Sequence, residues 1–201
     1  MHIERDIAMA TLDQIKDIQE LYVAYFSRPA DPAGLDYWAD QLDNNPNVYQ
    51  DIAAAFSVSA EYRATYADMD NRAIVSEVYE HLFGRVAESA GVDYWAAALD
   101  NRTITIDNVV TQIADGAQGA DSLAFTSKVA VAAAFTNRVD TDVEMVAYSG
   151  ASANQIAIDY IAGVRDLPSA ADHLDTDNID DAIAHIVGTP TGIEAVTPYI
   201  V

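Results

Sequence analysis

Two arginines have the side-chain chemistry and the setting to bind an anion. Arg28 is followed three residues later by Asp31, and Arg85 is followed by Glu88 at the same spacing. A guanidinium beside a carboxylate could contact the charged and hydroxyl groups of a polysaccharide. The same donors could instead satisfy the last carbonyl groups of one helix and the carboxylate that begins the next. We keep both interpretations, and the candidate ligand-binding residues are Arg28, Asp31, Arg85 and Glu88.

The sequence contains no recognisable catalytic or zinc-binding motif. None of the four histidines lies four residues from another, so the HExxH pair of zinc hydrolases is absent. There is no cysteine, which excludes disulfides, a thiolate nucleophile and cysteine-bound zinc. A G-x-S-x-G elbow and a phosphate-binding glycine loop are also absent. We therefore expect a protein that is not an enzyme and that needs no organic cofactor.

The densest acidic segment invites comparison with a calcium-binding loop. Counted from Asp175, the sixth position is Asp180, whereas the turn of that loop requires glycine there. Capping of a helix by Asp177, with solvated carboxylates near the helix start, explains the segment without a metal. The sequence therefore leaves metal-ligating residues unassigned.

The charge balance limits the partners that the protein can bind. The chain has 32 acidic and 10 basic residues, for a net charge of −22. Such a surface repels nucleic acid and anionic membranes, so we expect no nucleic-acid partner. It is suited to a medium rich in salt or calcium, where calcium could assist binding, although a simply solvated surface would have the same composition. No apolar run has the length of a signal peptide or a transmembrane helix.

The chain is organised around a repeat of constant spacing. Tyr22, Gly34 and Trp38 recur 57 positions later as Tyr79, Gly91 and Trp95. The further matched pairs are Phe26 with Phe83, Arg28 with Arg85, Ala33 with Ala90, Asp36 with Asp93, and Tyr37 with Tyr94. A match over this length indicates duplication.

Two features of the repeat lead to expectations about packing. The glycines recur early in a predicted helix, which indicates a close backbone crossing that a side chain would block. The Tyr37-Trp38 and Tyr94-Trp95 pairs lie at helical spacing beside small residues, so we expect them in the core. Stacking of these rings on a sugar is the alternative.

Hydrophobic periodicity predicts helices throughout the chain. Apolar residues three or four apart predict a first helix from Thr11 to near Ser27, and Asp31-Pro32 is typical of the start of a second. Further helices are predicted over 48–58, 59–66, 71–83, 89–101, 105–117, 122–137, 140–148, 153–164, 167–174 and 179–187. No segment alternates with period two, so we expect about nine or ten helices and no sheet. The predicted fold is an all-α, multi-helix bundle built from two tandem helical repeats plus a C-terminal helical cap.

The repeat also sets the expected domain boundaries. We place the first repeat in residues 1–70, a second, diverged repeat in 71–120, a C-terminal helical region that packs on the repeats in 121–188, and a linker in 189–201. The second repeat is assigned as diverged because Ser59 and Tyr62 align with Gly116 and Gly119. The last segment is rich in Pro, Thr and Gly without a helical period, and we expect further chain to follow it.

The repeated pattern Tyr-x-x-x-Phe-x-Arg-x-x-Asp/Glu-x-x-Gly-x-x-Tyr-Trp, followed by Phe56-Ser57-x-Ser59-x-Glu61-Tyr62, resembles the DUF4214 domain. The resemblance covers roughly Asp17–Ala117, with Ser27 in place of the usual Gly and Glu88 in place of the usual Asp. It implies a helical fold distantly similar to the phycobilisome linker polypeptides. It also implies occurrence in large secreted bacterial proteins, often beside calcium-binding RTX repeats.

The overall layout resembles the N-terminal anchoring region of RTX-type surface-layer proteins from Gram-negative bacteria. This resemblance implies type I secretion, an extracellular location at the cell surface, and attachment to a cell-surface polysaccharide, the lipopolysaccharide O-antigen, with calcium assisting. We therefore expect a non-enzymatic anchoring or assembly module. Two alternatives remain: a protein–protein scaffold that self-assembles into a lattice or filament, and an accessory domain of a secreted enzyme.

Overall fold

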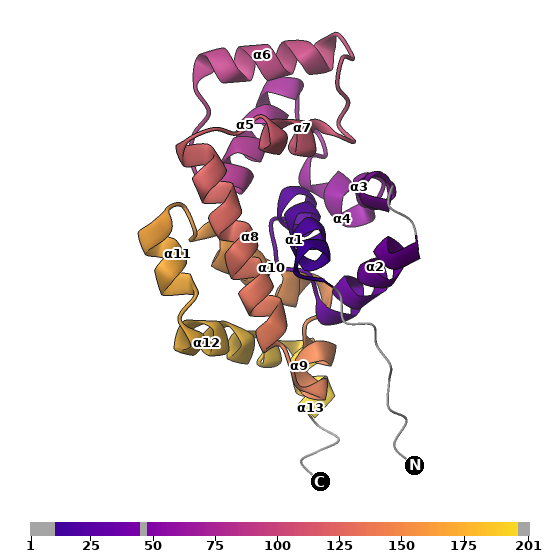
Figure 1. Cartoon of the computed structure of the whole chain (residues 1–201), viewed down its shortest axis with the longest axis vertical. Helices are drawn as coiled ribbons and strands as arrows, with labels where there is room; N and C mark the ends of the chain where they lie inside the picture. The colour runs from indigo at the N-terminus through magenta and orange to yellow at the C-terminus, as the bar shows by residue number, and fades with distance from the viewer. Residues whose placement is uncertain (1–10, 45–47, 197–201) are drawn as a thin grey trace.

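The structure, a computed structural model, describes residues 11–44 and 48–196, and these residues form thirteen α-helices and no strand. The helices are α1 (Leu12–Phe26), α2 (Pro32–Asn44), α3 (Val48–Ser57), α4 (Ala60–Thr65), α5 (Asn71–Phe83), α6 (Ser89–Asp100), α7 (Val109–Asp115), α8 (Ala120–Arg138), α9 (Asp142–Ala147), α10 (Gly150–Ala162), α11 (Leu167–His173), α12 (Thr176–Val187) and α13 (Pro190–Val196) (Figure 1). The expected all-α class is confirmed. The expected total of about nine or ten helices was too low, because each of the twelve predicted segments contains a separate helix and α13 is an additional one.

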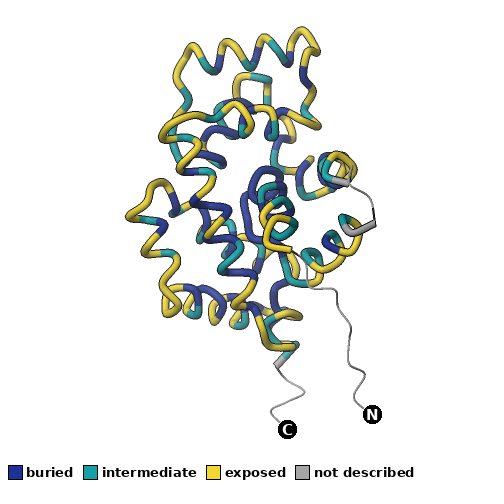
Figure 2. The backbone as a smooth tube through the Cα atoms, in the orientation of Figure 1, coloured by how far each residue is buried: buried dark blue, intermediate teal, exposed yellow. Residues whose placement is uncertain are grey.

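Helix α1 lies at the centre of the molecule. Thr11 and Gln14 form a reciprocal capping box at its start, and the helix ends at Ser27 in the left-handed conformation (φ 54°). It packs against α2, α3, α4, α5, α7 and α8. Most of its second half, from Ile18 to Phe26, is therefore buried, as the dark blue tube in Figure 2 shows.

The two repeats use the same arrangement of helices. In the first repeat α1 contacts α2, α3 and α4, and in the second α5 contacts α6, α7 and α8. The start of α8 thus occupies the position that α4 has in the first repeat. Glu61 is the second residue of α4, and Asp121 is the second residue of α8. Asp121 lies 36 residues after Arg85, whereas Glu61 lies 33 residues after Arg28, so the constant spacing pairs Glu61 with Gln118 and hides the counterpart.

One aromatic core joins α1, α2 and α3. The ring of Phe56 lies 4.9 Å from the ring of Tyr22, 4.6 Å from that of Phe26 and 5.6 Å from that of Trp38, measured between centroids. The same core cluster continues through Tyr79 and the rest of the second repeat. The repeats therefore share one hydrophobic core, since their first helices bury the matching aromatic positions.

The repeated glycines make room for a tyrosine, and the expected backbone crossing is wrong. A Cβ atom added to Gly34 would overlap the hydroxyl of Tyr22, and one added to Gly91 would lie 3.0 Å from the hydroxyl of Tyr79. Tyr22 and Tyr79 are themselves matched residues of the repeat. In each repeat, the tyrosine of the first helix therefore packs against the glycine of the second helix.

The tyrosine-tryptophan pairs divide between core and surface. Trp38 and Trp95 are half-buried against the shared core, as expected. Tyr37 and Tyr94 are 56% and 67% exposed, so their expected burial is wrong. Adjacent residues on a helix point in different directions, and the tyrosine and tryptophan rings of each pair meet in a T-shaped arrangement, with centroids 4.8 Å and 5.0 Å apart.

A buried polar network fixes the C-terminal region to the first repeat. The side-chain amide of Gln19 donates to the hydroxyl of Thr136 in α8 (2.8 Å), and its oxygen accepts from the backbone N–H of Ala30 (3.0 Å). The Thr136 hydroxyl donates to the carbonyl of Ala30 (2.6 Å). The Tyr148 hydroxyl donates to the carbonyl of Pro29 (2.7 Å). These bonds satisfy polar groups in the turn between α1 and α2 that would otherwise be buried without partners.

The segment expected to be a linker contains α13. Thr189 precedes Pro190 and caps the helix, accepting from the backbone N–H of Gly192 (3.2 Å) and, through its carbonyl, from that of Ile193 (2.8 Å). The helix packs against α9 and α12. Gly192 lies against the backbone of Val187, where a Cβ atom would overlap the chain. The glycine-rich composition therefore reflects close packing, and the expectation of a linker was wrong for residues 190–196.

Candidate functional site

Arg28, the first candidate ligand-binding residue, is buried within the protein and only 7% exposed. Its Nε and Nη2 atoms donate to the two carboxylate oxygens of Glu61 at 2.8 Å and 3.1 Å, and Nη1 donates to the carbonyl of Pro29. The guanidinium carbon lies 5.4 Å from the ring centroids of Tyr22 and Phe26. Asp31 is a weaker partner at 3.9 Å and caps α2 instead, accepting from the N–H of Gly34.

Arg85 repeats this arrangement nearer the surface. Its Nε and Nη2 atoms donate to the two oxygens of Asp121, both at 2.7 Å. Nη1 contacts Glu88 at 2.9 Å, and the ring of Tyr79 lies 5.2 Å from the guanidinium carbon. The hydrogen bond from the Glu88 N–H to its own carboxylate, and then the bond from Arg85, lower the pKa of Glu88.

The four predicted residues thus form two internal ion-pair clusters. The structure places Arg28 with Asp31 and Arg85 with Glu88, as the spacing predicts, and adds the main partners Glu61 and Asp121. Both guanidiniums have their donors aligned with protein oxygens, so they serve to hold the second half of each repeat against its first helix. This geometry favours the capping interpretation over direct ligand contact.

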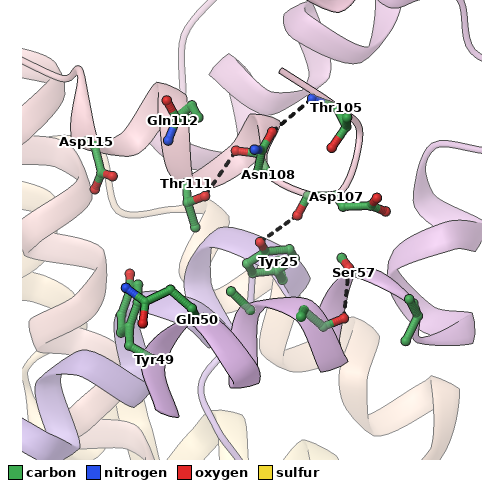
Figure 3. Close-up of a pocket in the computed structure, with 13 residues that line it drawn as sticks. Tyr25, Tyr49, Gln50, Ser57, Thr105, Asp107, Asn108, Thr111, Gln112 and Asp115 are labelled. Atoms are coloured by element: carbon green, nitrogen blue, oxygen red, sulfur yellow. Dashed lines mark hydrogen bonds between the residues drawn. The ribbon is translucent and has the colours of Figure 1, made fainter. Parts of the chain in front are cut away.

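A polar groove of about 540 Å³ opens between the two repeats. One wall is α3, with Tyr49, Gln50 and the small residues Ala53 and Ala54, and Tyr25 of α1 also lines the groove. The opposite wall is the segment that leads into α7 and α7 itself. Its lining residues are Thr105, Asp107, Asn108, Thr111, Gln112 and Asp115 (Figure 3). Groove volumes of ~300–1,000 Å³ are typical of small-molecule sites.

Hydrogen bonds fix the shape of the α7 wall. The Oδ1 atom of Asn108 accepts from the backbone N–H of Thr105 (2.9 Å), and Thr111 donates to the carbonyl of Asn108 (3.0 Å). The Tyr25 hydroxyl donates to the carbonyl of Asp107 (2.8 Å), which links this wall to α1. Because the Oδ1 atom of Asn108 faces the backbone N–H of Thr105, its side-chain NH₂ group points away from that N–H.

The electrostatics of the groove disfavour an anionic ligand. The residues that line it include the carboxylates Asp107 and Asp115 and no Lys, Arg or His. Burial raises the pKa of Asp115 above its usual value. Burial first, and then the nearby carboxylates of Glu20 and Asp115, raise the pKa of Tyr49, so its hydroxyl remains protonated at neutral pH. The groove thus offers carboxylate acceptors, amide donors and an aromatic ring to a ligand rich in hydroxyl groups.

No sequence motif identified this groove, because its walls come from separate repeats that are far apart in the chain. The available signal was the repeat itself, since α3 and α7 are matched helices of the two copies. Within the described residues, no group of three His, Asp or Glu side chains is placed to hold a metal ion. Calcium binding therefore stays a prediction.

The fold and the groove define an all-helical protein of two fused repeats with a polar cleft between them. Residues 9–66 and 53–119 each match the family model described as Domain of unknown function (DUF4214), and together they cover more than half of the chain. The chain therefore belongs to the DUF4214 family, as the residue pattern predicts. Comparisons with curated proteins and with solved structures gave no match. Among the described helices, none is both long and apolar enough to span a membrane.

Proposed function

We propose that this protein is a non-enzymatic carbohydrate-binding module that anchors a secreted bacterial protein to cell-surface polysaccharide. The groove between α3 and α7 is the proposed ligand site. The observation that carries the proposal is its lining, which combines the ring of Tyr49 with the amides of Gln50, Asn108 and Gln112 and two carboxylates. Sugars present an apolar ring face and a rim of hydroxyl groups, and this lining complements both.

The charge of the site refines the expected ligand. Because the groove contains carboxylates and no cationic side chain, an uncharged stretch of polysaccharide fits it better than an acidic one. The lipopolysaccharide O-antigen of a Gram-negative cell surface remains the proposed polysaccharide, and calcium remains a proposed aid. Arg28 and Arg85 act in this proposal as structural residues that hold α4 against the end of α1 and α8 against the end of α5.

The test measures retention of the whole chain on purified lipopolysaccharide and on the delipidated O-polysaccharide, with and without a calcium chelator. Tyr49→Ala and Gln112→Ala should each weaken the apparent affinity roughly tenfold, because each removes a ring contact or a hydrogen bond. Tyr94→Ala is the matched control, since Tyr94 is an exposed ring of the second repeat that lies outside the groove.

The outcomes separate the parts of the proposal. Equal retention of all three variants would exclude the groove, and loss in Tyr94→Ala alone would move the site to the exposed rings. Absence of retention for the unmodified chain would exclude anchoring. Retention that a chelator does not change would exclude the role of calcium.

Self-assembly is the second candidate function, and exposed apolar residues favour it. Met145 and Val146 of α9 and Ile193 of α13 are 40%, 57% and 57% exposed, and these two helices pack together. Light scattering over a range of protein concentrations tests this candidate. A mass that rises with concentration in the unmodified chain and stays monomeric in Val146→Glu would support it, and a constant monomer mass would exclude it.

A further inference from the structure

Lys128 is a buried cation without an acidic partner. It is 1% exposed, and its Nζ atom donates to the backbone carbonyl of His81 at 2.6 Å. An ammonium group has three N–H donors, so this bond leaves two for another acceptor. Within the described residues, no carboxylate oxygen lies within 4 Å of Nζ, although the chain carries 32 acidic residues. Burial lowers the pKa of Lys128 to about 8.

The side chain of Lys128 lines a small pocket where the two repeats and the C-terminal region meet. The pocket has a volume of about 130 Å³. Ser27 and Gly84, the matched residues that end α1 and α5, both line it, together with Arg165 after α10. At ~30 Å³ for each molecule of liquid water, the volume suits a small oxyanion rather than a sugar or a nucleotide.

Arg165, which is exposed to solvent, also lines this pocket and forms no ion pair with the described residues. The described part of the chain contains three lysine or arginine residues without a carboxylate oxygen within 4 Å, namely Arg102, Lys128 and Arg165. Two of these three meet here. Glu80 also lines the pocket, more than 4 Å from both cations, and His81 is directed to Glu77, with Nε2 3.1 Å from the carboxylate.

We propose that this pocket is a binding site for a small oxyanion, either inorganic phosphate or a short carboxylate, held by Lys128 and Arg165. The Lys128 ammonium supplies two N–H donors from the buried side, the Arg165 guanidinium supplies a planar pair of donors, and the Ser27 hydroxyl supplies another. Bound anion neutralises a charge that is otherwise buried without a partner. Because the site joins α1, α5, α8 and α10, anion binding stabilises the contact between the repeats and the C-terminal region.

The test is the thermal unfolding midpoint of the whole chain in a buffer free of oxyanions, with inorganic phosphate or acetate added and ionic strength held constant with sodium chloride. Phosphate should raise the midpoint in a saturable way, as expected for a ligand that binds only the folded state. Arg165→Gln should weaken the apparent affinity for phosphate by about tenfold or more, because one charged donor pair is lost. Acetate in place of phosphate shows which oxyanion the site prefers.

Two further variants make the result specific. Arg102→Gln removes the unpaired cation that lies outside the pocket and should leave the phosphate effect unchanged. Lys128→Met replaces the buried ammonium with an apolar chain of similar length and should abolish the effect. The proposal would be overturned if neither phosphate nor acetate had a larger effect than chloride, or if the effect were equal in Arg165→Gln and the unmodified chain.

Discussion

Arg28 and Glu61 form a bidentate ion pair, with N–O distances of 2.8 Å and 3.1 Å, that closes the first repeat by holding α4 against the end of α1. Arg85 and Asp121 form the same pair in the second repeat, with α8 in place of α4. The pair therefore survives duplication although its carboxylate has changed from Glu to Asp. Its distance from the arginine along the chain has also changed.

The two ion pairs predict unequal losses of stability. Arg28→Ala should lower the free energy of unfolding by about 3 kcal/mol, because the Arg28 side chain is only 8% exposed and its loss leaves the half-buried Glu61 carboxylate without its partner. Arg85→Ala should cost about 1 kcal/mol, since the Arg85 side chain is 34% exposed, so that less packing is lost and water already screens the ion pair. Urea denaturation measures both values. Arg63→Ala is the control, because Arg63 is 62% exposed and lies 4.0 Å from Asp107. Equal losses for Arg28→Ala and Arg63→Ala would contradict the structural role.

The contact between Tyr22 and Gly34 predicts a measurable coupling. Alanine has a higher helix propensity than glycine, yet Gly34→Ala should destabilise the protein by about 1–3 kcal/mol, because its methyl group would overlap the Tyr22 hydroxyl. Tyr22→Phe removes that hydroxyl. In a double-mutant cycle, the loss caused by Gly34→Ala should therefore be smaller in the Tyr22→Phe background.

Gly91→Ala is the matched variant of the second repeat. The added methyl group would lie 3.0 Å from the Tyr79 hydroxyl, so a small shift accommodates it and the loss should be smaller than for Gly34→Ala. Additive effects of Gly34→Ala and Tyr22→Phe, measured by urea denaturation, would show that the hydroxyl contact is not the reason for the glycine.

Local signals predicted most helices correctly, and long-range contacts explain what was missed. Thr11 caps α1 at the start that the sequence predicts, because a cap depends on residues two or three positions away. The expected cap Asp177 is wrong, since it lies inside α12 and Asp175 caps that helix instead. Glu61 lies 33 residues after Arg28, so no local spacing identifies it as the partner. Thr189-Pro190 carries the same start signal as Asp31-Pro32, but the surrounding Gly and Thr residues concealed a helix that depends on tertiary packing.

The candidate site also combines a feature that sequence spacing predicts with features that depend on tertiary packing. The pairing of Arg85 with Glu88 follows from a spacing of three residues that brings the two side chains together. The groove needs the relative placement of α3 and α7, which depends on the whole core between them. The burial of Lys128 was not predicted either, because the position of a lysine within an apolar helix does not indicate whether its ammonium reaches water.

The network around Gln19 predicts that one polar residue holds the C-terminal region in place. Gln19→Met keeps the volume but leaves the buried N–H of Ala30 without its acceptor, so stability should fall by about 1–3 kcal/mol. Hydrogen exchange at the Ala30 amide should accelerate. Ser76→Ala is the control, since Ser76 holds the matching position on α5 and bonds only within its own helix to the carbonyl of Arg72. Unchanged exchange at Ala30 in Gln19→Met would contradict the network.

Lys128 predicts a specific pH dependence of stability in the absence of oxyanions. Its pKa falls from 10.5 in the unfolded chain to about 8 in the folded protein, because burial disfavours the ammonium. Between these values the unfolded chain binds more protons, so this group's contribution to stability rises with pH and is lost as pH falls through about 8. The nearby charges are Arg165, which lowers the pKa, and Glu80, which raises it.

Comparison with Lys128→Met isolates this contribution, because the two proteins share every other titrating group. At pH 7 the variant should be more stable than the unmodified chain, because it removes a buried charge that has no acidic partner. By pH 10 this advantage should shrink by a few kcal/mol, in line with the difference between the two pKa values. Urea denaturation of both proteins at four or five pH values in this interval measures the difference. A difference independent of pH would show that Lys128 keeps an ordinary pKa and that its ammonium reaches solvent.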